Sequence, residues 1–286
     1  RLDQLVDAIN RPFDSAKPPY LSMFVTALRS VDATVEWAAK RVLLGATVLN
    51  GVSLTARLEE GRLEVKPFAA DHLEGQFIGM LAVNTQGEEP AVAIEVAAHR
   101  LDVGRTLAQL AVTDQIEGIA DLTLNFSSRG STFGSLLAQG TLQAAAGPST
   151  FLLRRESHDN PTSFRLITAE VSAAPSKPIT LQLKSFLRDQ PVTLTATGGP
   201  LAHLVEAPQA WPIALSDQFP TFVARVKGTV APPWNQPGLD LAVTLKGKQL
   251  HTLSAIFPTD LPYELTGQVT GAHDTYRFSR LAARLA

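Results

Sequence analysis

The 286-residue chain contains no cysteine, which excludes a disulfide framework and a thiolate metal site. It also carries little net charge, because 25 lysine and arginine residues nearly balance 27 aspartate and glutamate residues. The basic residues are dispersed along the chain, whereas a nucleic-acid-binding protein clusters them on one surface. We therefore expect no nucleic-acid partner, and the redox compartment stays undetermined.

The sequence has no hydrophobic run that is long enough to cross a bilayer as a helix. The apolar run at residues 42–56 is interrupted by Asn50, Ser53 and two glycines, whereas a transmembrane helix needs about 20 predominantly apolar residues. The chain starts at Arg1 and stops at Ala286 within a strand-like pattern. We therefore expect a segment of a longer protein, with any signal or membrane anchor outside it.

Local motifs of catalysis are missing as well. The six histidines are scattered without an HExxH motif, so no zinc site is predicted. Residues 130–134 (GSTFG) superficially resemble a nucleophile elbow, but the central residue is Thr132 and no α/β pattern surrounds it. Glycine-rich phosphate-binding motifs are absent from the sequence. We expect no enzymatic activity, no catalytic residue, no metal and no cofactor.

The composition that is present, 45% apolar and 18% charged residues, is that of a folded protein. The most informative stretch is residues 49–84. Apolar and polar residues alternate over 52–58, a Glu-Gly turn follows at 60–61, and the alternation resumes over 63–66. This period of two predicts an antiparallel hairpin with one face in water. Residues 76–83 are apolar at both parities, and we expect them to lie deeper.

Strand-like patterns separated by glycine- and proline-rich turns continue along the chain. We expect strands at 91–98, 119–126, 140–145, 150–156, 163–173, 178–187, 190–197, 221–230, 238–246, 263–270 and 275–285, and a turn at 158–162 (HDNPT). Short segments with leucine-like residues at helical spacing recur at Leu2, Val103, Phe133, Leu201 and Leu250. We expect these segments to cap an open sheet, and gates along a conduit are the alternative.

The pattern predicts a mainly β protein built on an elongated, curved antiparallel sheet, or groove, with short amphipathic helices between the strands. Residues 1–30 are expected to form a short helical lead-in, although residues 20–29 fit a helix or a strand. Residues 31–286 are expected to form the repetitive β-groove domain.

The C-terminal part of the chain resembles the bacterial AsmA family. Its members repeat a strand, a Pro loop, a GLDL strand, a turn with spaced leucines, an LP-led strand and a closing strand. The matching stretches are GTVAPP at 228–233, GLDL at 238–241, GKQLHTL at 247–253, LPYEL at 261–265 and YRFSRLAARL at 276–285. Residues 54–81 and 116–142 are similar to the upstream part of the family, with Glu60 in place of the usual Asp in the hairpin turn.

The resemblance implies a protein anchored in the inner membrane with its bulk in the periplasm. It implies an elongated β-groove related to TamB and the bridge-like lipid-transfer proteins, and a role in moving phospholipid toward the outer membrane or in maintaining that membrane. No catalytic residue is implied.

On this basis we expect the apolar side of the strands to hold acyl chains of phospholipid, because hydrocarbon needs only dry, non-directional contact while backbone groups stay paired in the sheet. The predicted lining residues are Val52, Leu54, Leu58, Leu63, Val65, Phe77, Leu81, Val92, Ile94, Val96, Leu122, Leu124, Phe126, Leu239, Leu241, Val243 and Leu245.

Three alternatives stay open at this point. The same apolar residues could simply pack a protein core. The protein could be a periplasmic scaffold for outer-membrane biogenesis that binds a partner protein by edge-strand addition. An enzyme is the third alternative, although no constellation of acid, base or nucleophile can be assembled from the sequence. Whether the open ends of the sheet are closed by self-association is undetermined.

Overall fold

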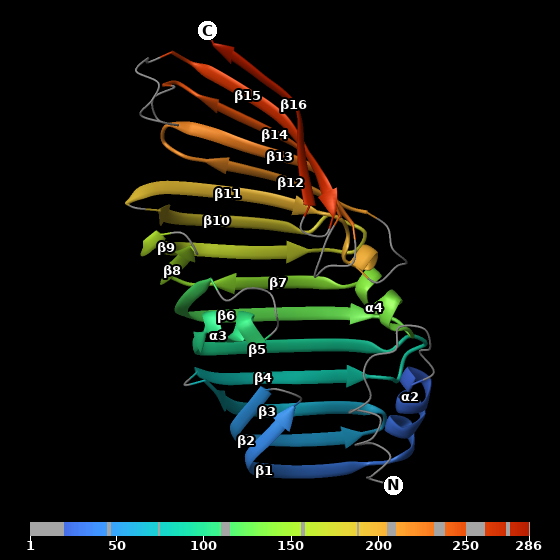
Figure 1. Ribbon diagram of the computed structural model, residues 1–286. Coiled ribbons are helices and arrows are strands. Elements are labelled where there is room, and N and C mark those ends of the chain that lie inside the picture. Colours follow the sequence, from blue (N-terminus) through green and yellow to red (C-terminus); the bar gives the residue numbers. More distant parts are fainter. Residues whose placement is uncertain are drawn as a thin grey trace.

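The computed structural model describes residues 20–44, 47–73, 75–109, 115–155, 158–187, 189–204, 210–231, 238–249, 261–272 and 275–285. The described strands form one 16-stranded sheet in which paired strands are antiparallel. They lie side by side in one curved layer that runs from β1 near the N-terminus to β16 near the C-terminus (Figure 1). The predicted fold class, a mainly β protein with an elongated, curved antiparallel sheet, is confirmed.

The strands follow one another in the sheet almost in chain order; only β8 leaves the path, pairing with β6 and β9. Their bounds are β1 (Ala33–Leu44), β2 (Thr47–Glu59), β3 (Arg62–His72), β4 (Gly75–Asn84), β5 (Ala91–Asp102), β6 (Ile116–Arg129), β7 (Thr141–Ala146), β8 (Ser149–Arg155), β9 (His158–Ala173), β10 (Thr180–Leu187), β11 (Gln190–Gly198), β12 (Trp211–Gln218), β13 (Phe222–Ala231), β14 (Gly238–Gly247), β15 (Tyr263–Ala272) and β16 (Thr275–Leu285).

The helical segments are short and lie at the ends of strands. The described ones are α2 (Tyr20–Ser30), α3 (Val103–Gln109), α4 (Phe133–Ala138) and the 3-10 turn η1 (Leu201–Leu204). In Figure 1, α2 and α4 lie beside one set of strand ends, and α3 lies at the opposite ends of β5 and β6. The helical segments expected at Leu2 and Leu250 lie outside the described residues.

The sequence explains why α4 begins where it does. The Thr132 hydroxyl accepts a hydrogen bond from the Ser135 backbone N–H at 3.1 Å, and the Ser135 hydroxyl accepts one from the Thr132 N–H at 3.0 Å. This reciprocal pair is a capping box, which satisfies N–H groups that the first helical turn leaves unpaired. The central residue of the GSTFG run therefore caps a helix.

The strand register assigns each residue to one of two faces, because side chains directly opposite each other on antiparallel strands point to the same side. We call the side that carries Leu54 the apolar face and the other side the polar face. On the polar face, Glu95 pairs with Asn125 and Asn125 pairs with Gln143. The alternation seen in the sequence thus becomes a sheet with two chemically different faces.

Two local expectations were wrong, and one strand was missed. Residues 158–162 were expected to form a turn, but β9 begins at His158, which pairs with Arg155. The strand β12 was not expected at all. The strand β4 does not lie deeper than its neighbours: it is an ordinary member of the sheet, and Ile78 on its second apolar parity is 42% exposed.

Candidate functional site: the apolar face of the sheet

A single row of apolar side chains crosses the sheet from β1 to β15. Each member pairs in register with the next, and the row is Trp37, Leu54, Phe68, Gly79, Val96, Leu124, Ala144, Val171, Leu181, Ala196, Leu215, Val226, Val243 and Gly267. No polar side chain interrupts it. Because neighbouring strands lie about 4.8 Å apart, the row is roughly 60 Å long.

The register places all the predicted lining residues on this same apolar face. Those of β2 to β6 are connected through pairs such as Val65 with Leu81 and Ile94 with Phe126. Those of β14 join the face through Val226, which pairs with Val243. The two groups, far apart in the sequence, therefore belong to one surface.

The sequence prediction assigned no lining residues to the middle strands of this surface. The strands β7 to β13 were expected in part, but none of their residues was assigned to the lining. The register now adds Leu142, Val171, Leu181, Leu183, Leu194, Leu215 and Val226 to the apolar face. Their parity could have been read from the alternation within each strand, such as TLQLKSFL in β10.

One corner of the apolar face is an ordinary packed core. Ala120, Phe151 and Leu166 are buried there, and Val103 of α3 packs against them. The predicted lining residue Leu122 also packs against this cluster. At this corner the protein itself covers the face, as the core alternative expected.

Elsewhere the apolar face has no second layer among the described residues. The extensive strand-to-strand contacts join neighbours within the sheet, and the helices pack at strand ends. Large apolar side chains are consequently open to solvent: Leu124 is 37% exposed, Trp37 43% and Phe278, on β16, 67%. Soluble proteins seldom leave a contiguous apolar surface of this extent uncovered, so such a surface marks a site of interaction.

A few polar groups interrupt the face outside the central row, and the protein satisfies several of them, including Ser185, whose hydroxyl donates to the Val192 carbonyl. The buried ring of His72 lies 2.8 Å from the Val48 carbonyl through Nδ1 and 3.2 Å from the Gln109 side chain through Nε2. The buried Ser128 hydroxyl donates to the Leu136 carbonyl. His72 and Ser128 thus tie strand ends to α3 and α4.

Asp217 of β12 is different, because one of its oxygens has no partner. It pairs in register with Leu194 and Ala224, so its side chain lies on the apolar face. Its Oδ1 is buried without a hydrogen-bond partner among the described residues. Burial raises the pKa of the Asp217 carboxyl, and its hydrogen bond with the Gln218 backbone opposes this rise.

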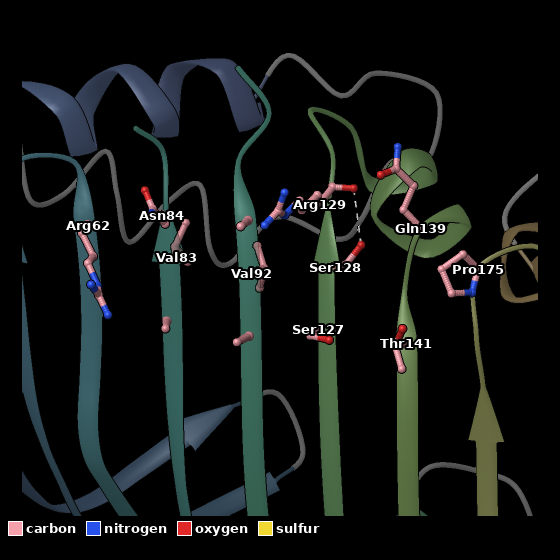
Figure 2. A pocket seen from close by; sticks show the side chains of 13 residues that line it. Arg62, Val83, Asn84, Val92, Ser127, Ser128, Arg129, Gln139, Thr141 and Pro175 are labelled. Atoms are coloured by element: carbon pink, nitrogen blue, oxygen red, sulfur yellow. Dashed lines mark hydrogen bonds between the residues drawn. The ribbon is translucent and has the colours of Figure 1, made fainter. Parts of the chain in front are cut away.

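The opposite face carries a hollow of about 610 Å³ at the ends of β3 to β7, and both apolar and polar residues line it. Figure 2 shows Arg62, Asn84, Ser127, Arg129 and Thr141 around it. These side chains offer hydrogen-bond donors and acceptors over an open surface. The hollow does not overlap the central apolar row.

Other kinds of site find no support in the described part of the chain. No three histidine, aspartate or glutamate residues gather there in a way that could hold a metal ion. None of the described helices is both long enough and apolar enough to cross a membrane. Comparisons with protein-family models, curated proteins and solved structures found no match.

Proposed function

We propose that this chain is a non-enzymatic, lipid-binding part of a lipid-transfer protein, and that its apolar face holds the acyl chains of phospholipids. The observation that supports this best is the unbroken apolar row from Trp37 to Gly267. A row of roughly 60 Å, with sheet neighbours about 4.8 Å apart, offers hydrocarbon a continuous path. This is the geometry that a conduit needs and that an isolated binding pocket does not.

The energetics favour an acyl chain as the cover. Each methylene group transferred from water to an apolar surface contributes about 0.8 kcal/mol. The backbone groups beneath the face are already paired in the sheet, so hydrocarbon can lie on them without stranding hydrogen-bond donors. The polar face, in contrast, presents exposed polar side chains such as Glu95 and Asn125 to water.

The cellular setting in this proposal comes from the resemblance to the AsmA family. It places the chain in the periplasm, attached to the inner membrane through a segment outside this sequence, and gives it a part in moving phospholipid between the inner and outer membranes. The apolar row is consistent with that setting.

The test is the lipid content of the purified protein, measured by native mass spectrometry and by extraction. We expect the wild-type chain to retain phospholipid. Leu124→Asp places a charge in the centre of the row at a side chain that is already 37% exposed, so the sheet should tolerate it. Thr123→Asp is the matched control, because Thr123 is the exposed neighbour on the polar face.

We expect Leu124→Asp to lose bound lipid and Thr123→Asp to keep it, with both variants folded by circular dichroism. A wild-type protein that carries no lipid after purification, and takes up none from phosphatidylethanolamine and phosphatidylglycerol vesicles, would overturn the proposal. Equal lipid content in both variants would remove Leu124 from the binding surface.

A second candidate function is a scaffold that binds a partner protein through the last strand. In the described sheet β16 pairs on one side only, with β15. It also exposes large apolar side chains, with Phe278 at 67% and Leu281 at 74%. An edge of this kind can accept a further strand from another chain. Capture of a folded protein partner by a lipid-free wild-type chain would favour this function.

A further inference from the structure

A carboxyl group and a pair of aromatic rings lie together at one margin of the apolar face. Asp217 is the last residue but one of β12, and the chain then turns through Phe219 into β13. The Phe219 backbone N–H donates to the Phe222 carbonyl at 2.9 Å, which closes this turn. The two phenyl rings stack with centroids 4.3 Å apart and an interplanar angle of 25°.

The register fixes how these three side chains lie relative to one another. Phe222 pairs with Gly247 of β14, which places it on the apolar face with Asp217. Asp217 pairs with Ala224, so Phe222 is its diagonal neighbour, at a typical separation of about 7 Å between such positions. Phe219 lies in the turn after β12, and its stacking on Phe222 places its ring at the same margin of the face. The carboxyl group therefore borders the stacked rings.

Nothing in the surrounding described strands neutralises this carboxyl group. Its lateral neighbours on the apolar face are Leu194 and Ala224. Arg225 and Lys227 of β13 fall on the opposite parity and pair with polar-face residues. The apolar face of β10 to β14 carries no lysine or arginine. Asp217 Oδ1 is thus a buried acceptor that has no hydrogen-bond partner within the described ranges.

A buried acceptor without a partner destabilises the protein that contains it. Asp217 as a residue is only half-buried, so an ammonium group can reach its carboxylate and stabilise the charge through a charge-assisted hydrogen bond, which is shorter and stronger than a neutral one. The faces of the neighbouring phenyl rings also attract a cation. An anionic headgroup would be repelled by the same carboxylate. The position therefore favours a positively charged headgroup over an anionic one.

The apolar row lies next to this cation site and offers a surface for a hydrocarbon chain. Leu215 precedes Asp217 by two residues on the same face and is a member of the row, with Ala196 and Val226 as its register partners. A hydrocarbon chain attached to a cation at Asp217 could therefore run directly onto the row. The site is built for an amphiphile, because a small free ammonium ion would leave the apolar half unused.

We propose that Asp217, with the stacked rings of Phe219 and Phe222, binds the ammonium headgroup of an amphiphile whose hydrocarbon chain lies along the apolar face. This inference rests on the proposed lipid-binding function and adds a headgroup class to it, a primary ammonium of the kind that ethanolamine phospholipids carry. Burial raises the pKa of the Asp217 carboxyl, and a bound cation would favour its ionised form.

The test compares two single-chain probes of equal length, decylammonium and decanol, by isothermal titration calorimetry on the whole chain at neutral pH. Wild-type protein should bind decylammonium about tenfold more tightly than decanol, which is the size of effect expected for one charge-assisted contact. Asp217→Asn should bring the ratio close to one while leaving the affinity for decanol unchanged. Glu95→Gln is the matched control, since Glu95 is an exposed carboxylate on the polar face, and it should keep the wild-type ratio.

The outcomes separate the headgroup site from the lipid-binding surface. If wild-type protein binds both probes equally, or if Asp217→Asn keeps the wild-type ratio, the headgroup site is overturned and the apolar face stands. If wild-type protein binds neither probe, the proposed lipid function itself fails. Phe222→Leu keeps the apolar volume and removes one ring of the stack, so a selective loss of decylammonium binding in this variant would independently support the cation site.

Discussion

The ring of Tyr263 occupies the space above Gly247, its register partner on the neighbouring strand. A Cβ atom added to Gly247 would lie 2.4 Å from Cε1 of Tyr263 and 2.5 Å from Cζ. Tyr263 is only 3% exposed in this position. The absence of a side chain on β14 thus creates the place where the aromatic ring of β15 packs, at the same margin of the apolar face as Phe222.

This relationship predicts that Gly247→Ala displaces the Tyr263 ring. The contact is shorter than any that real Cβ atoms make, so either the ring or the strand must shift, and overpacking of this kind lowers the free energy of unfolding by about 1–3 kcal/mol. Gly238→Ala, on the same strand, is the control, because its nearest neighbour would be the Ala231 Cβ at 3.4 Å. Urea unfolding should show a clear loss only for Gly247→Ala. Equal stability of the two variants would contradict the packing described here.

A second prediction concerns the pH dependence that Asp217 gives to stability. Its pKa in the folded protein lies above the ordinary value of 3.8 because burial disfavours the charged form. The folded protein holds the proton of Asp217 more tightly than the unfolded chain does. This contribution to stability is fully present below the unfolded-state pKa and is lost as the pH rises through the folded-state pKa. The free energy of unfolding should fall more between about pH 4 and about pH 7 in the wild-type protein than in Asp217→Asn.

Urea titrations of both proteins across this pH range measure the difference directly. Glu95→Gln again serves as the control, because it removes a carboxylate from the polar face. Wild-type and Asp217→Asn curves that run parallel over the whole range would show that the Asp217 carboxyl is not destabilised by burial.

Much of the apolar face could be predicted from the sequence, because alternation within a strand states which residues share a side. How the sides of successive strands align depends on register, and bulges change it. Leu63 and Val65 lie at odd positions of β3 and Phe68 at an even one, yet a register shift between Val65 and Phe68 brings all three to the apolar face. No pattern of one strand alone reveals this shift, so Phe68 was missed.

The strand that carries the proposed headgroup site was missed for a different reason. Its sequence, WPIALSDQ, contains Pro212, Ser216 and Asp217, residues that usually mark turns or interrupt alternation. The neighbours β11 and β13 hold it in the sheet through register pairs along its length. A carboxylate on the apolar parity breaks the very pattern used to find strands, so sequence reasoning fails first at such a position.

A third prediction follows from the contacts of His72. His72→Phe preserves a ring next to Phe77 but removes the polar contacts to the Val48 carbonyl and the Gln109 side chain. Loss of hydrogen bonds at a buried site should lower the free energy of unfolding by about 1–3 kcal/mol. It should also speed amide hydrogen exchange in α3, whose last residue is Gln109.

His99→Phe is the matched control for this change, because the His99 side chain is 57% exposed on the polar face. It should leave both stability and the exchange of α3 close to wild type. Unchanged exchange in α3 for His72→Phe would show that this helix is held by Val103 and its apolar neighbours alone.

A fourth prediction concerns the open end of the sheet at β16. Leu281 lies on the apolar side, since its Cδ2 would be 2.8 Å from a Cβ added to Gly267, and it is 74% exposed. Ala282 pairs with Thr266 and lies on the polar side of the same strand. We expect the isolated chain to self-associate by covering this apolar margin, because exposed edge strands with apolar side chains bind one another unless charge prevents it.

Leu281→Lys should then shift the sedimentation profile toward monomer across a concentration series. Ala282→Lys adds the same charge to the same strand but leaves the apolar margin intact, so it should sediment like the wild-type chain. Equal effects of the two lysines would mean that association runs through the backbone edge of β16, as the scaffold function requires, and a wild-type chain that stays monomeric would mean that this margin is not a self-association surface.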